Sequence, residues 1–206
     1  MSTSHKLAFG PTVIEAVTIG ATNAIPIMVN VLLWGLTIWI PYLNVGTTIG
    51  LFTGVIAKAS KGEPIPVIEI FDPSYRKYIG EFFVTFGLMQ VGILAGLTFF
   101  IVPGIVIYLA WCFAPLLLVD KHMNPAEAIS VSNDCTYGYK WAMFGITLAV
   151  EFAFFIVGGS AGGVLIYIVR KSFSLQLLVL LLLVAVFGFL MVGLKASFYR
   201  RLTDGH

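Results

Sequence analysis

Glu151 is the charged residue that lies deepest inside an apolar segment of this sequence. About 15 Å of helix separates it from Trp141, which places it near the middle of a bilayer core about 30 Å thick. A carboxylate at that depth is costly and marks a candidate functional site. Gln90 lies at a similar depth in another apolar segment. The two residues could handle protons or cations, or a protonated Glu151 could bond to Gln90 or a backbone carbonyl and fix helix packing.

The polar residues after Val119 have a simpler explanation in local structure. Asp120–His122 follow an apolar segment, and their spacing matches no metal motif, so we interpret them as a solvated helix end. Asn124 and Glu127 have the spacing of a capping box, with Pro125 in the first helical turn. These residues therefore predict a helix start rather than a reaction centre.

The remaining candidates for chemistry lack the partners that chemistry requires. Ser130 and Ser132 have no nearby histidine and no nucleophile elbow. Cys112 and Cys135 lack metal-ligand spacing. The glycine-rich stretch Gly158–Gly163 has no Lys-Ser/Thr and so is not a phosphate loop. It can be a hairpin turn or a close-packing surface. We expect no catalytic residue, no cofactor and no metal, and hence a protein that is not an enzyme.

Composition places the chain in the membrane. Hydrophobic residues make up 59% of the 206 positions and charged residues only 11%, against about 25% charged in soluble domains. The net charge of +2 gives no reason to expect nucleic-acid binding. The expected partners are membrane lipids and further copies of the chain.

The apolar pattern predicts an all-α polytopic membrane protein, with residues 1–206 forming a single membrane domain. We expect about six transmembrane helices arranged as three hairpins, over residues 25–57, 72–119 and 141–199. Two interfacial amphipathic helices are predicted at residues 11–24 and 124–137. The first could instead be the start of the first membrane helix.

Short uncharged turns are expected to close the three hairpins on one side. They are Pro41–Asn44, Pro103-Gly104 and Gly158–Gly163. With the N-terminus in the cytoplasm, ten of the twelve Lys and Arg residues fall on the cytoplasmic side, and only Arg170 and Lys171 on the far side. This positive-inside bias predicts a cell (inner) membrane protein with both termini in the cytoplasm.

Gly46, Gly50 and Gly54 recur at four-residue steps, so they share one face of a helix. Small residues on one face let another backbone approach closely. That backbone could belong to the same chain or to a second copy in a homo-oligomer.

A longer motif resembles a known family. From Phe99 to Trp141 the chain has a Pro103-Gly104 turn, an apolar helix ending at Asp120, and then Pro125 and Ala128 at set steps. This pattern resembles the YciC-like group of bacterial integral membrane proteins, which is related to the membrane region of some glycerophosphodiester phosphodiesterases. The resemblance implies a helical membrane fold and no particular activity.

Taken together, the sequence predicts a non-enzymatic membrane scaffold or accessory protein that acts by self-assembly and lipid contact. The alternative is a channel or transporter for ions or small molecules that uses Glu151.

Overall fold

The structure is a computed structural model that describes residues 7–203, and every regular element in that range is helical. The first group of helices is α1 (Phe9–Thr22), α2 (Ala24–Thr37), α3 (Pro41–Ile49) and α4 (Ile56–Lys61), with a π-helical segment, Gly50–Val55, between α3 and α4. Two 3₁₀ turns, Glu69–Phe71 and Pro73–Tyr78, lead into the second group. It consists of α5 (Ile79–Phe99), α6 (Ile101–Trp111), α7 (Ala114–Asp120), α8 (Pro125–Thr136), α9 (Lys140–Ile168) and α10 (Phe173–Thr203).

Within residues 7–203, four helical segments are long and apolar enough to cross a membrane: Pro73–Phe99, Ile101–Asp120, Lys140–Ile168 and Phe173–Thr203. Helices α1 and α2, bent by 77° relative to each other, make a fifth if they count as one broken span. These helices fit the predicted multi-pass membrane protein. The predicted count of six spans is not confirmed, because α2 has 14 residues, about 21 Å, and α3 has nine.

The reversal between α5 and α6 lies at Phe100 and not at Pro103-Gly104. Phe100 has an extended backbone (φ −162°, ψ 158°), and Pro103 and Gly104 already lie in the first turn of α6. Proline fits there because the first-turn N–H groups have no acceptor within the helix. Gly104 permits close packing instead, since a Cβ on it would lie 3.1 Å from the backbone N of Leu97 in α5.

Helix α9 continues through Gly158–Gly163, where the sequence predicted a turn. The chain reverses at residues 169–172, so Arg170 and Lys171 lie at the tip of the α9–α10 hairpin. Gly162 faces α10, and a Cβ there would meet Leu183 at 2.5 Å. Glycine is a weak helix former in water but is common in membrane helices.

The C-terminal half of α10 is the centre of the core. Its residues from Val192 to Thr203 are mostly buried, and they pack against α1, α2 and α4. Helix α1, predicted to lie in the membrane interface, packs along α10 with Thr12, Ala16 and Gly20 buried. A Cβ on Gly193 would lie 2.2 Å from the carbonyl oxygen of Ala16, so glycine is required at this crossing.

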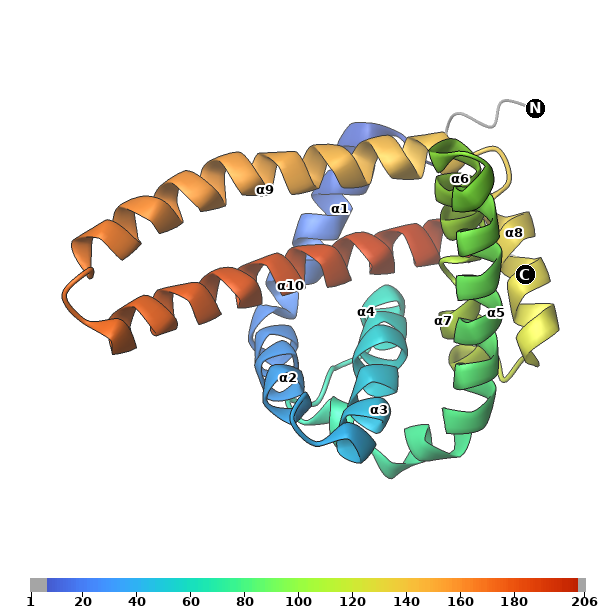
Figure 1. The fold of residues 1–206 in the computed structure, drawn as a ribbon, viewed down its shortest axis with the longest axis horizontal. Coiled ribbons are helices and arrows are strands. Elements are labelled where there is room, and N and C mark those ends of the chain that lie inside the picture. Colours follow the sequence, from blue (N-terminus) through green and yellow to red (C-terminus); the bar gives the residue numbers. More distant parts are fainter. Residues whose placement is uncertain (1–6, 204–206) are drawn as a thin grey trace.

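The outer part of the α9–α10 hairpin extends away from the rest of the molecule (Figure 1). We call residues 148–184 the arm. Many large apolar side chains of the arm are exposed, among them Phe152, Phe155, Val164, Leu178 and Leu182. In Figure 1 the arm runs across the view, whereas α5 runs along its height, so the two hairpins point in different directions.

Candidate functional site

Asp120 lies at a junction of three helices and not in solvent, which corrects the prediction of a solvated helix end. Its side chain is only 6% exposed. One carboxylate oxygen forms an ion pair with Lys61 of α4, and the other accepts a hydrogen bond of 2.9 Å from the Tyr199 hydroxyl of α10. Asp120 therefore ties α4, α7 and α10 together.

A second ionic contact joins the two ends of the described chain. Glu15 of α1 pairs with Arg201 of α10 and accepts a hydrogen bond of 3.0 Å from Ser197. Arg200 lies 3.5 Å from the other Glu15 oxygen. These contacts hold α1 along α10, and the sequence separation made them impossible to foresee.

Glu69 is a buried carboxylate with two partners. Lys58 donates to one of its oxygens at 2.7 Å and Tyr75 donates to the other at 2.5 Å. The ring of Tyr75 fits because Gly50 and Gly54 carry no side chain: a Cβ on Gly54 would lie 1.9 Å from the Tyr75 hydroxyl. In the described structure Gly50 and Gly54 thus face the segment of the same chain that contains Ile70 and Tyr75.

Two further buried polar residues, Asn30 and Ser132, have structural roles that the sequence analysis did not predict. The Asn30 side chain donates to the carbonyls of Pro26 and Pro66 and accepts from the Ile70 backbone N–H, which anchors the 62–71 connector. Ser132 donates to the Ala110 carbonyl and accepts from the Phe113 N–H. It thereby satisfies backbone groups left free at the break between α6 and α7.

The caps at the start of α8 come from residues close in sequence. Asn124 accepts a hydrogen bond of 2.9 Å from the Glu127 backbone N–H, and its amide donates to the Glu127 side chain at 3.1 Å. Pro125 occupies the first helical turn. Asn124, Pro125 and Glu127 therefore form the N-terminal cap of α8, as the sequence predicted.

Glu151 and Gln90 are both exposed, on α9 and α5. Neither forms a hydrogen bond or ion pair with any residue from 7 to 203, so the structure does not bring them together. Glu151 lies on an open apolar groove of about 640 Å³ between α9 and α10, lined chiefly by Phe and Leu side chains.

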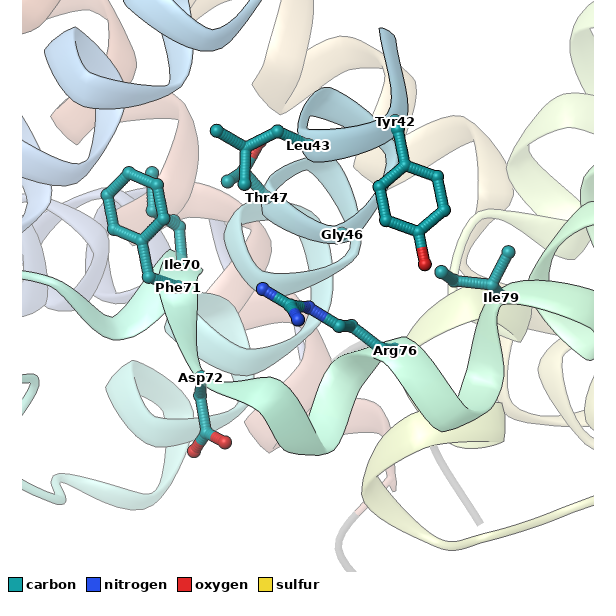
Figure 2. A pocket seen from close by; sticks show the side chains of 9 residues that line it. All are labelled: Tyr42, Leu43, Gly46, Thr47, Ile70, Phe71, Asp72, Arg76 and Ile79. Atoms are coloured by element: carbon teal, nitrogen blue, oxygen red, sulfur yellow. The ribbon is translucent and has the colours of Figure 1, made fainter. Parts of the chain in front are cut away.

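A smaller hollow lies between α3 and residues 70–79, which lead into α5 (Figure 2). Its volume is about 20 Å³, and Gly46, Tyr42 and Phe71 contribute to its walls. The guanidinium of Arg76 points into this hollow, whereas the carboxylate of Asp72 points away from it (Figure 2). Arg76 lines this hollow, whereas the groove beside Glu151 has no Lys or Arg in its lining.

The polar side chains described above stabilise the fold, and they do not form a recognisable catalytic or metal-binding group within residues 7–203. No group of three or more His, Cys, Asp or Glu within residues 7–203 is placed to hold a metal ion. No protein-family model, curated protein or solved structure matches this chain. The resemblance to the YciC-like group and the expectation that the chain is not an enzyme therefore stay predictions.

Proposed function

We propose that this chain is a non-enzymatic membrane scaffold or accessory protein that acts through lipid contact and self-assembly. The arm is the observation that supports this function. Its two long helices present exposed Phe, Leu and Val side chains over most of their length. In contrast, the charged residues Glu15, Glu69 and Asp120 form ion pairs with other helices of the chain outside the arm.

Self-assembly is supported by the exposed glycines of the arm. A Cβ at Gly159 or Gly163 would meet nothing within 4 Å, so both leave open space on the α9 surface. Lipid supplies no hydrophobic driving force between helices, and small residues favour their close packing. We propose that a second copy packs here, and the protein mass of the particle in lipid nanodiscs tests this.

For the orientation, we propose both termini in the cytoplasm of a bacterial cell and the α9–α10 tip outside. The excess of Lys and Arg on the cytoplasmic side supports this choice. An inner-membrane location follows from the same argument.

Reconstitution in liposomes tests the scaffold function. We expect vesicles that contain the protein to differ in diameter from protein-free vesicles at the same lipid composition, because the arm occupies the bilayer. Replacing Phe152 and Phe155 together by Ala should weaken the effect, since both are large apolar side chains exposed on the arm. Unchanged vesicle diameters with the wild-type protein would contradict the scaffold proposal.

The alternative function is transport of protons or cations by Glu151, and the groove on which Glu151 lies favours it. Glu151→Gln keeps the shape of the side chain and cannot ionise. Because Glu151 has no hydrogen-bond or ion-pair partner among residues 7–203, neither Gln nor Leu should lower stability. A pH-dependent flux in wild-type liposomes that Glu151→Gln abolishes would replace the scaffold function by transport.

A further inference from the structure

Arg76 is a cation held in a concave setting without an anion. Among residues 7–203 it forms no hydrogen bond and no ion pair. The nearest part of its stem, Cγ, lies 3.9 Å from the position of a Cβ on Gly46, so the side chain passes over the glycine at ordinary contact distance. Its guanidinium is thereby directed into the hollow of Figure 2.

The one carboxylate that lines the hollow does not neutralise Arg76. Asp72 accepts a hydrogen bond of 2.8 Å from the Ser74 backbone N–H, and its carboxylate points away from the hollow (Figure 2). Glu69, which lies nearby in sequence, already has Lys58 and Tyr75 as partners. The guanidinium thus keeps its donors free for an external acceptor.

The surroundings of the hollow have the character of a lipid headgroup region. Trp39 and Tyr42 are 90% and 78% exposed at the adjoining α2–α3 turn. Helix α5 begins only three residues after Arg76, at Ile79, and carries no charge from Phe82 onward. Trp and Tyr gather at the level of the headgroups, and a guanidinium binds phosphate through two parallel hydrogen bonds.

We propose that this hollow binds the phosphate of an anionic phospholipid, with Arg76 as the side chain that contacts it. This inference rests on the proposed function, because it names the lipid that the scaffold contacts. A volume of about 20 Å³ holds little more than one water-sized group, so one phosphate oxygen enters and the rest of the headgroup stays at the mouth.

Lys77 provides a matched control. It is the next residue and carries the same charge, but its ammonium lies 4.8 Å above the ring of Tyr78 and does not line the hollow. Arg76→Gln and Lys77→Gln therefore remove equal charge at neighbouring positions. Gly46→Leu is a second route to the same loss, because its side chain fills the hollow without removing either positive charge.

Native mass spectrometry on protein released from nanodiscs with equal phosphatidylglycerol and phosphatidylcholine measures the retained lipid. We expect wild type to retain phosphatidylglycerol preferentially. Arg76→Gln and Gly46→Leu should lower this preference about tenfold, and Lys77→Gln by less than twofold. Equal losses in Arg76→Gln and Lys77→Gln, or no preference in wild type, would overturn the proposal.

Two further experiments distinguish the source of the phosphate and separate loss of binding from loss of folding. Displacement of the lipid by millimolar inorganic phosphate would show that free phosphate is the ligand, and would overturn the lipid proposal. Thermal unfolding of each variant separates loss of binding from loss of folding, and Arg76→Lys should restore part of the preference if folding is intact. Vesicle diameter is a separate readout, so failure of the scaffold function is distinguishable from failure at Arg76.

Discussion

Asp120 and Tyr199 are 79 residues apart in the chain and share a hydrogen bond of 2.9 Å. The bond joins the end of α7 to the buried half of α10. Lys61 completes the contact from α4 on the other carboxylate oxygen. A single carboxylate thus fixes the relative positions of three helices that are remote in sequence.

Removing the Tyr199 hydroxyl should destabilise the protein. Tyr199→Phe deletes one hydrogen bond to a charged acceptor, which is worth about 1.5 to 3 kcal/mol. Asp120→Ala should cost more, since it also leaves Lys61 without its carboxylate. Thermal unfolding in detergent measures both. Tyr137→Phe is the control, because Tyr137 is 77% exposed, and equal unfolding temperatures for Tyr199→Phe and wild type would refute the role of the bond.

Gly54 should tolerate no side chain. A Cβ would lie 1.9 Å from the Tyr75 hydroxyl, so Gly54→Ala forces the buried ring to move, at a cost of about 1 to 3 kcal/mol. Gly46→Ala is the matched control, since its nearest contact is 3.9 Å. If Tyr75 is the obstacle, Tyr75→Phe in the Gly54→Ala background should recover part of the stability. Normal folding of Gly54→Ala with loss of an oligomer would instead place this glycine at an interface between copies.

Cysteine accessibility distinguishes a continuous α9 from a turn at Gly158–Gly163. In a background with Cys112 and Cys135 replaced by Ala, Ser172→Cys should react with a membrane-impermeant reagent added outside. Ser130→Cys should react only after the membrane is opened. Ser160→Cys should stay unlabelled, because Ser160 lies within α9, two helical turns before the tip. Outside labelling of Ser160→Cys would restore the predicted turn.

The cap at Asp72 should give a stability difference that depends on pH. The hydrogen bond from the Ser74 backbone N–H lowers the pKa of Asp72 below its usual 3.8. A lowered folded-state pKa means that the stabilisation is fully present above the unfolded pKa and is lost as the pH falls through the folded value. Asp72→Ala should cost about 1 kcal/mol at pH 7 and less near pH 3. Unfolding temperatures of variant and wild type across that range test this, and a constant difference would contradict it.

Local features were predictable from the sequence, whereas contacts between distant residues were not. The Asn124–Glu127 cap involves residues three positions apart, so the motif itself contains the interaction. Asp120 looked like a solvated helix end because neither Lys61 nor Tyr199 is near it in sequence. The same holds for Gly54. Its neighbour Tyr75 lies 21 residues later, beyond a segment whose sequence shows no helical periodicity.

The turn predicted at the glycine-rich stretch of α9 was wrong because the helix that packs against it could not be identified from the sequence. Local propensity favours a break at Gly158–Gly163. In the structure Gly162 lies against Leu183 of α10, and this packing supports a continuous helix. The hollow at Arg76 was equally hidden, since Gly46 and Arg76 meet only once α3 and the connector are folded.

Helix α10 is one uninterrupted element of 31 residues that contains no proline. Its outer half belongs to the arm and its inner half carries Tyr199 and Arg201, which bond to Asp120 and Glu15. Because α10 is continuous between its two halves, a change in the angle of the arm would be transmitted along the helix toward both contacts. In a bilayer whose thickness does not match the length of the arm, a tilt of the arm would therefore strain the junctions of α1, α4 and α7.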